Sequence, residues 1–450
     1  MPTKTFSPLI SALTAGMLSI TLYWYCSAQE PTAATLVSRT APSVKASDAP
    51  RPAATLGHSA FMSPHASPIA TQGNRVFVVN TPADTVDVID GTRRTVIARI
   101  PVGVDPVGLA IRPDGKELWV ANHISDSVSV IDIDPQSLTQ LSVIATLQDF
   151  DPATRATRFD EPVGIAFASN DKAYVALSSE NAIAVINVST RQITKRLDIT
   201  AQDPRAIRVQ GNRLYVIPFE SNNKTQLSGG AGDKIDGDLV TFDAWEHSIR
   251  NNNVLSIGHV VDIIKHPRVP DRDLYVFDTQ TDKLIEVVDT LGTLLYGLTV
   301  DSKGHVFIAQ TDARNEVNGR SGTKKHGLAE LQNRAFLNQI TSIDLGQPDI
   351  QKPTFMNLEP LPPKQPEQDM ALATPFAIEI TPDDSTLVVS AAGSDKIFTV
   401  DVETGNVISR VDVEAVPRGI ALATSEDGKQ THAWVLNAVA NTVSLVDVSN

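Results

Sequence analysis

Cysteine is almost absent from this sequence: Cys26 is the only one among 450 residues. An internal disulfide needs two cysteines. Thiolate zinc sites, iron–sulfur clusters and the Cys-x-x-Cys-His attachment of haem also need two or more. The sequence therefore excludes all four kinds of site, and we expect no cofactor within this chain.

Positive charge is also scarce. Lys and Arg number 38 against 52 Asp and Glu, so the formal net charge is −14, and no run of basic residues stands out. Binding of nucleic acid depends on a basic surface that displaces counterions from phosphates. We therefore expect no nucleic-acid partner. The composition, with 42% hydrophobic and 20% charged residues, is that of a folded globular protein.

Familiar catalytic motifs are missing as well. The chain has no Gly-x-Ser-x-Gly elbow, no His-Glu-x-x-His pair and no phosphate-binding loop. Asp383 and Asp384 follow Thr381-Pro382, a sequence typical of a turn between strands. The sequence therefore favours a protein without catalytic activity, although it leaves an enzyme open as an alternative.

The first 28 residues have the features of an export signal. Lys4 is the only charged residue before Glu30, and the apolar run after it ends in the small residues Ser27 and Ala28. We predict a signal peptide over residues 1–28 and a periplasmic or secreted protein. An uncleaved signal would be long enough to anchor the chain, and this is the only membrane contact we expect. Lipid attachment at Cys26 is disfavoured by the bulky residues that precede it.

Residues 29–60 are rich in Ala, Pro, Ser and Thr and contain few large apolar residues. Such a segment buries too little apolar surface to fold alone, so we predict a linker. His58 and His65 lie seven residues apart near its end. They are either metal ligands or linker residues, and the second interpretation is favoured.

A repeated block of four short strands extends over residues 61–450. Its clearest copy begins at Pro106-Val107-Gly108, turns at Arg112–Gly115, and continues with the apolar runs Glu117–Asn122, Ser127–Asp132 and Leu141–Leu147. Alternating apolar runs separated by Pro, Asp and Gly are typical of strands joined by turns. A bare unit has about 42 residues, as between Pro162 and Pro204.

Seven copies of the block are present. Each is marked by an anchor at the start of its first strand, and the anchors are Pro68, Pro106, Pro162, Pro204, Tyr296-Gly297, Pro375 and Pro417. The last copy ends at its third strand, Thr442–Asp447. We therefore expect the segment before Pro68 to supply its fourth strand and to close a ring. A chain cut inside its last blade is the alternative.

The runs Leu118–Asn122 with Val128–Asp132, and Trp434–Asn437 with Val443–Asp447, resemble the Tyr-Val-Thr-Asn (YVTN) propeller repeat. The resemblance implies an all-β fold, a seven-bladed β-propeller of four-stranded antiparallel blades. The chain also resembles the propeller half of longer exported proteins that carry a C-terminal di-haem c-type cytochrome domain. That resemblance implies haem c only in a partner or in a missing C-terminal domain.

Three insertions interrupt the repeat, at about 148–161, 219–270 and 311–338. By the strand order they all fall on one face of the ring, and we expect them to form a cap over the central channel. Asp233, Asp236 and Asp238 in the second insertion suggest either a Ca²⁺ site or a solvated loop. Their spacing does not match an EF-hand, so we assign no metal site.

The candidate ligand-binding residues are polar side chains expected on the capped face: His123, Arg205, Glu220, Asn222, Asn223, Lys224, Gln310, Asp312, Arg314 and His326. The basic residues of the third insertion stand out in an acidic protein, and they suit an anionic ligand or an acidic partner. Asn80, Asn122 and Asn437 lie where a strand enters a turn, so we expect them to be structural. We assign no catalytic residue.

We therefore expect an exported, non-catalytic propeller that binds a protein or a small ligand on its capped face, within a periplasmic redox system that includes a c-type cytochrome. One alternative is a lactonase-like hydrolase, which would require Glu220, Asp312 and His123 to converge. A second alternative is the propeller part of a haem electron-transfer protein.

Overall fold

A computed structural model describes residues 63–220, 272–314, 331–346, 352–425 and 430–449, with the backbone of four short strands at 35–37, 225–227, 241–242 and 261–263. All of them belong to one unit, Pro31–Asn450, and the account below is confined to it. The predicted signal peptide lies outside the described residues.

The described strands fall into blades of four, each paired in chain order from an inner to an outer strand. The first three blades consist of β2 (Ile69–Gln72), β3 (Arg75–Asn80), β4 (Thr85–Asp90) and β5 (Thr95–Pro101); β6 (Pro106–Ile111), β7 (Glu117–Asn122), β8 (Ser127–Asp132) and β9 (Ser142–Leu147); and β10 (Pro162–Phe167), β11 (Lys172–Leu177), β12 (Ala182–Asn187) and β13 (Gln192–Asp198). A short 3₁₀ helix, η1 (Thr81–Ala83), joins β3 to β4.

The next three blades have the same order. They consist of β14 (Gln202–Gln210), β15 (Arg213–Glu220), β19 (Leu274–Asp278) and β20 (Lys283–Val288); β21 (Leu294–Val300), β22 (His305–Ala313), β23 (Phe336–Asp344) and β24 (Thr354–Asn357); and β25 (Pro375–Ile380), β26 (Thr386–Ala391), β27 (Lys396–Asp401) and β28 (Val407–Asp412). Glu220 also pairs with Leu294, which joins the fourth and fifth blades into one larger sheet.

The last blade contains β29 (Pro417–Thr424), β30 (Thr431–Asn437) and β31 (Thr442–Asp447), and its outer strand is β1 (Thr35–Val37), which pairs with β31 in parallel. The prediction that the segment before Pro68 completes this blade is confirmed. The strand lies inside the segment predicted to be a linker. Strand β1 closes the ring, because it joins the N-terminal part of the chain to β31 of the last blade.

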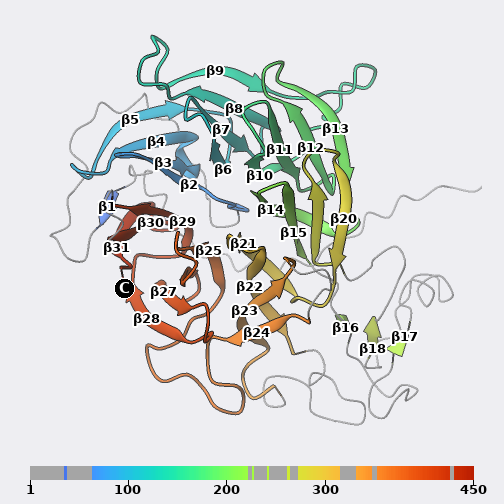
Figure 1. The fold of residues 1–450 in the computed structure, drawn as a ribbon, viewed down its shortest axis with the longest axis vertical. Coiled ribbons are helices and arrows are strands. Elements are labelled where there is room, and N and C mark those ends of the chain that lie inside the picture. Colours follow the sequence, from blue (N-terminus) through green and yellow to red (C-terminus); the bar gives the residue numbers. More distant parts are fainter. Residues whose placement is uncertain are drawn as a thin grey trace, which may run out of the picture. The chain divides into compact units, whose positions relative to one another are not determined.

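The inner strands contact one another in cyclic order, β2, β6, β10, β14, β21, β25 and β29, and β29 contacts β2 again. Figure 1 shows the blades arranged around this centre. The fold is therefore an all-β propeller, as predicted. The two large gaps between anchors are also explained as predicted, because β15 pairs with β19 and β22 pairs with β23 across the inserted segments. Part of the first of these insertions forms a small sheet of β16 (Thr225–Leu227), β18 (Val261–Ile263) and β17 (Thr241–Phe242).

Apolar side chains pack between the faces of neighbouring blades. One cluster between the second and third blades contains Trp119, Phe159 and Leu177, all fully buried, and similar clusters follow around the ring. Blade-to-blade packing is therefore the main source of hydrophobic stabilisation.

A β-bulge lies at the start of the inner strand in six of the blades. The pairing with the second strand skips Val107 in β6, Arg205 in β14, Tyr296 in β21 and Arg418 in β29. The bulges in β10 and β25 skip Val163 and Phe376 together with the following residue. A bulge inserts an extra residue and redirects its side chain away from the ladder.

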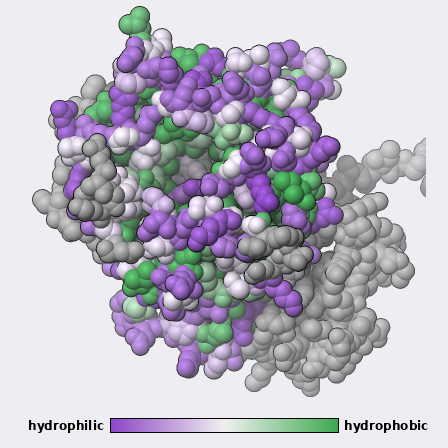
Figure 2. Space-filling model, in the orientation of Figure 1, coloured by the Kyte–Doolittle hydropathy of each residue, from purple (hydrophilic) through white to green (hydrophobic). Residues whose placement is uncertain are grey.

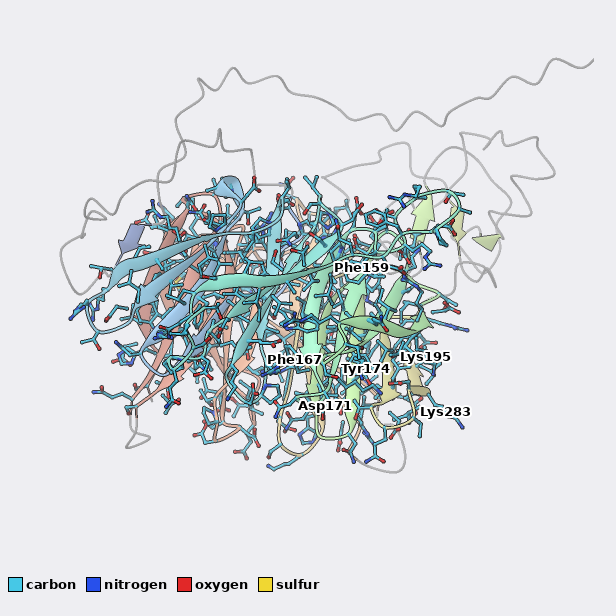
Figure 3. The ribbon with its side chains drawn as sticks, turned by 90° about the horizontal axis from the view of Figure 1, so that it is seen from above. Phe159, Phe167, Asp171, Tyr174, Lys195 and Lys283 are labelled. Carbon is cyan, nitrogen blue, oxygen red and sulfur yellow. The ribbon has the colours of Figure 1, made fainter. Side chains whose placement is uncertain are left out.

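The starts of the inner strands and the ends of the second strands share one face of the ring, because Pro106 pairs with Asn122 and Pro204 with Pro218. We call it the insertion face. Figure 3 shows Phe159, from the loop between β9 and β10, toward this face. It shows Asp171, from the turn between β10 and β11, and Lys283, at the start of β20, toward the opposite face. A further long loop, 358–374, joins β24 to β25 on the insertion face, and the sequence analysis missed it.

Among the described residues on the face drawn in Figure 2, hydrophilic residues predominate and hydrophobic residues form small separate groups. These residues form no broad apolar patch of the kind that marks a hydrophobic interface.

Glycines two residues after the anchor let adjacent inner strands approach each other. A Cβ on Gly108 would lie 2.4 Å from the carbonyl oxygen of Val163 and 2.6 Å from that of Ala66. Gly164 and Gly297 stand equally close to the carbonyl oxygens of Arg205 and Phe376. The first anchor proline occupies a different strand position from the others. Ile69 and Leu109 pair with equivalent residues, Val78 and Val120, of their second strands. Pro68 is therefore equivalent to Gly108 and not to Pro106.

Replacing Gly108 by Val should lower the free energy of unfolding by at least about 2 kcal/mol, because its side chain meets rigid backbone on two sides. Gly211→Asn is the matched control. Gly211 has a φ of +57° and nothing within 4 Å of its Cβ position, and Asn tolerates that conformation, so the loss should stay below about 1 kcal/mol. Urea unfolding measures both values. Equal stability of wild type and Gly108→Val would contradict the close packing.

Candidate functional site

A cavity of about 370 Å³ occupies the centre of the ring, and residues from all seven inner strands line it. Its volume lies within the range of small-molecule pockets, about 300–1,000 Å³. The bulges stand at the start of the inner strands, and three bulged residues, Tyr296, Phe376 and Arg418, line the cavity there. We call this end of the cavity the mouth. At the same level of the other blades stand Ser67, which also lines the cavity, and Val107, Val163 and Arg205, which do not.

Residues Ser63–Ser67, which we call the strap, cover one half of the mouth. Ala66 donates a backbone hydrogen bond to Val107, and it packs with Val107 and Val163 in a small buried cluster. The Ser63 hydroxyl donates to Asp105 over 2.9 Å. The valine half of the mouth is therefore closed by packing.

The other half of the mouth is an arc of aromatic rings with a guanidinium at each end. The Arg205 guanidinium lies 3.8 Å from the centre of the Phe219 ring, and Arg418 lies 5.3 Å from that of Phe376. Tyr296 stands between the two phenylalanines, with ring centres 5.6 and 5.2 Å away. Cation–π contacts of this kind hold each guanidinium against a ring face.

The two arginines differ in how their charge is balanced. Arg205 forms a two-pronged ion pair with Asp203. Arg418 lines the cavity and donates from Nη1 to the carbonyl oxygen of Ser63 over 2.9 Å, and within the described part of the chain it has no carboxylate partner. Its buried Nε also has no acceptor among those residues. Burial and the nearby charge of Arg205 lower the pKa of Arg418.

His65 belongs to the strap and is buried, with 2% of its surface exposed. The Thr81 hydroxyl gives its one proton to the carbonyl oxygen of Pro106, so its 2.9 Å bond to His65 must be donated by Nε2 of the imidazole. Nδ1 is then an acceptor, and it has no partner among the described residues. Burial, with a smaller effect of Arg418, lowers the pKa of His65 to about 3.

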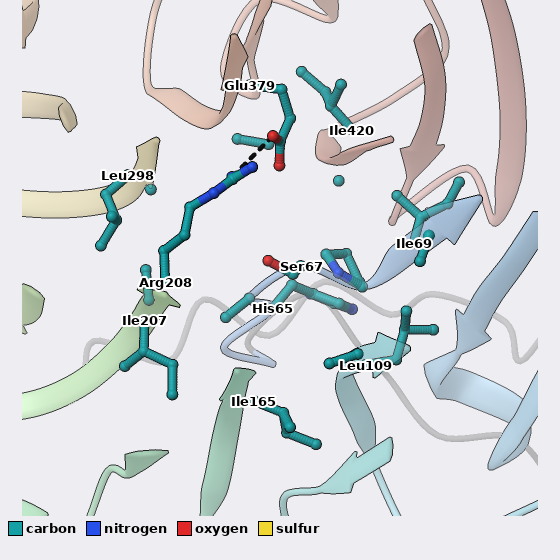
Figure 4. A pocket seen from close by; sticks show the side chains of 18 of the residues that line it. His65, Ser67, Ile69, Leu109, Ile165, Ile207, Arg208, Leu298, Glu379 and Ile420 are labelled. Carbon is teal, nitrogen blue, oxygen red and sulfur yellow. Dashed lines mark hydrogen bonds and ion pairs between the residues drawn. The ribbon is translucent and has the colours of Figure 1, made fainter. Parts of the chain in front are cut away.

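A second polar layer lies deeper in the channel. Arg208 of β14 and Glu379 of β25 form an ion pair of 2.8 Å across the intervening strand β21 (Figure 4). Both side chains are partly exposed to the cavity, with 34% and 23% of their surface accessible. The channel is therefore polar on the same side as the aromatic arc.

Of the residues predicted to bind a ligand, Arg205 stands at the level of the mouth. Glu220 ends β15 beside β21. His123 follows β7, and its Nε2 lies 4.0 Å from Glu161, a weak contact. Arg205 and Glu220 belong to the fourth blade, and His123 belongs to the second. Each of the three contacts different neighbours.

Gln310, Asp312 and Arg314 follow one another along β22 and its end. Gln310 is fully buried and donates to Gln339 and Thr341 on the next strand. Asp312 accepts from Thr293, and Arg314 donates to the carbonyl oxygens of Leu331 and Arg334. Asn222, Asn223, Lys224 and His326 lie outside the described residues, as do Asp233, Asp236 and Asp238.

Gln310 occupies the same position in its blade as Asn80, Asn122 and Asn437 in theirs. Asn122 donates to Ser127 and Ser129, and Asn437 to Thr442 and Ser444, in the same cross-strand pattern as Gln310. These amides therefore tie the second strand to the third, which supports the structural role predicted for the asparagines.

The described residues offer neither a metal-binding cluster nor a membrane-spanning helix. They contain no group of three or more His, Cys, Asp or Glu residues arranged to hold a metal ion. They also contain no helix with the length and apolar character needed to cross a membrane.

Arg418, Tyr296 and Phe376 were not among the predicted binding residues, and His65, for which a linker position was favoured, is buried against the ring. A sequence signal for Arg418, Phe376 and Tyr296 was available. Arg418 and Phe376 directly follow an anchor proline, and Tyr296 is part of its anchor. The residue at this position is aromatic or basic only in the fourth to seventh blades. His65 carried no such signal, because its burial depends on the strap.

Comparison with known proteins supports the fold. A family profile described as YNCE-like beta-propeller matches residues 40–155. A solved chain of Kuenenia stuttgartiensis hydrazine synthase is similar, with a TM-score of 0.60 and 18% sequence identity over 87% of this chain and 97% of that chain. At this identity the likeness shows the fold alone. A search of curated protein sequences found no match.

The buried His65 should make stability depend on pH. Above pH 6.5 the imidazole is neutral in both folded and unfolded chains. Between pH 6.5 and about 3 only the unfolded chain takes up the proton. The free energy of unfolding should therefore fall with decreasing pH, by up to about 1.4 kcal/mol per pH unit from this group.

His65→Gln is the matched variant, because its amide also donates to Thr81 but does not titrate. Urea unfolding at pH 7.5, 6 and 5 should give a smaller pH dependence for the variant than for wild type. The same dependence in both proteins would show that His65 is not buried in its neutral form.

Proposed function

We propose that this protein is a non-catalytic binding propeller and that the mouth of its channel receives the anionic group of a ligand. The observation that supports this most directly is Arg418: a half-buried guanidinium with unused donors, set against Phe376 and without a carboxylate partner among the described residues. Buried charges in proteins are normally paired. A carboxylate or phosphate from a ligand would supply the missing partner.

The rest of the mouth suits the same ligand. The rings of Tyr296 and Phe376 give an apolar surface beside the guanidinium, and the strap closes the opposite half. An anion that enters here exchanges water for a charge-assisted hydrogen bond in a partly desolvated site, where such bonds are strong. The Arg205 charge adds to the attraction, although Asp203 offsets most of it.

Export to the periplasm or beyond, and service to a redox system with a c-type cytochrome, remain part of the proposal. Export is supported by the uncharged run after Lys4. The similarity to a hydrazine synthase chain concerns the fold and does not carry that activity over. A hydrolase is not favoured, because His123, Glu220 and Asp312 belong to three different blades and each has its own neighbours.

Binding of hexanoate, a monoanion with an apolar chain, tests the proposal by titration calorimetry. Arg418→Met keeps the stem of the side chain but removes its charge, and it should weaken hexanoate binding at least about tenfold, or about 1.4 kcal/mol. Arg93→Met removes an exposed arginine from a turn on the opposite face and should leave binding unchanged. Equal affinities of wild type and Arg418→Met would contradict the proposal, as would absence of binding to wild type.

A further inference from the structure

The channel continues well below the mouth. We compare the inner strands at the position three residues after the mouth residue. Four blades have alanine there, namely Ala70, Ala110, Ala166 and Ala421. The fourth, fifth and sixth blades have Arg208, Thr299 and Glu379. Ala70, Ala110 and Ala166 line the cavity, as do Arg208 and Glu379 of the ion pair, whereas Ala421 and Thr299 do not. In an extended strand, three residues span about 10 Å. The cavity thus has a cationic mouth and a deeper polar layer separated by a distance of that order.

The deeper layer has unused hydrogen-bonding capacity. Glu379 uses Oε2 to accept from Nη1 of Arg208, and within the described part of the protein its other carboxylate oxygen has no partner. Figure 4 shows the pair to one side, with His65 and Ser67 of the strap near the middle of the view and Ile69 and Leu109 farther away. An apolar molecule that fills the cavity would strip water from this oxygen without replacing the hydrogen bond, which is costly. A hydrogen-bond donor would replace it.

We infer that the ligand is an elongated organic anion with a neutral hydrogen-bond donor at its far end. Its anionic head pairs with Arg418 at the mouth, and its tail, a hydroxyl or amide group, donates to Glu379. This inference rests on the proposed function. Simple anions such as phosphate or acetate satisfy the mouth alone and leave most of the 370 Å³ unfilled.

The charge of the tail follows from the ion pair. Glu379 is already balanced by Arg208 at 2.8 Å, so a cationic tail would meet a guanidinium of the same sign. A second carboxylate would meet Glu379 itself. A neutral donor avoids both repulsions.

Three six-carbon probes separate these possibilities by titration calorimetry: hexanoate, 6-hydroxyhexanoate and 6-aminohexanoate. They share the carboxylate head and the chain length and differ only in the tail. With wild type, 6-hydroxyhexanoate should bind about tenfold more tightly than hexanoate, and 6-aminohexanoate should not exceed 6-hydroxyhexanoate. Equal affinities of hexanoate and 6-hydroxyhexanoate, or tightest binding of 6-aminohexanoate, would overturn the inference while leaving the proposed function intact.

The double variant Arg208→Met with Glu379→Gln removes both charges of the deeper layer together and leaves neither side chain as an unpaired ion. It should reduce the preference for the hydroxylated probe over hexanoate to threefold or less. Arg418→Met should weaken all three probes. If no probe binds wild type, both the proposed function and the inference fail. A preference that persists in the double variant would contradict the role of Glu379. Circular dichroism and the urea midpoint verify that each variant folds.

Discussion

At the start of three inner strands, β6, β10 and β21, the backbone of one blade packs directly against the backbone of the next. The Cβ position of Gly108 would come within 2.4 Å of a carbonyl oxygen, and Gly164 and Gly297 repeat the same contact. This close approach brings the strand starts together around the axis. The adjacent bulges then add one residue per blade, which is freed from the ladder. The mouth of the channel is therefore a consequence of how tightly the blades converge.

The mouth residues differ in chemical character from blade to blade. Those of the second and third blades are valines, and those of the fourth to seventh are basic or aromatic. The strap directly precedes β2, and its Ala66 packs on the valines of the second and third blades. The fourth to seventh blades are left with Arg205, Tyr296, Phe376 and Arg418. Closure of the ring and asymmetry of the mouth are thus linked, because the same N-terminal segment contributes to both.

Much of the fold was predictable because the repeat encodes it. The paired runs around Trp119 and Val130 gave the blade, and the missing fourth strand in the last copy indicated closure by the N-terminal segment. Pro68 lies two positions later in its blade than the prolines of the other copies do in theirs. The sequence did not predict this shift, because Pro68 looks like any other anchor proline, and the strap takes the place of the usual start of the strand. The loop 358–374 was missed because it lies in the same interval between anchors, Tyr296-Gly297 to Pro375, as the longer insertion predicted at 311–338. The sequence analysis attributed the extra length of the interval to that insertion alone.

The site was harder to predict than the fold. Gln310 attracted attention as a polar residue near an insertion, yet its amide replaces a repeat asparagine and bonds across strands. Arg418 drew none, because the residue after the anchor is hydrophobic in the clearest copy of the repeat, Pro106-Val107-Gly108. Its significance depends on the absence of a carboxylate around it in the described part of the fold, a property of three-dimensional neighbours.

The central claim is that the axial mouth, and not the outer rim, holds the ligand's anionic group. Crystals soaked with 6-bromohexanoate test it most directly, because the anomalous signal of bromine locates the tail independently of the carboxylate density. The account predicts the carboxylate within hydrogen-bonding distance of the Arg418 guanidinium and the bromine inside the channel. A bromine signal found only on the rim or the opposite face, with the channel holding solvent alone, would contradict it.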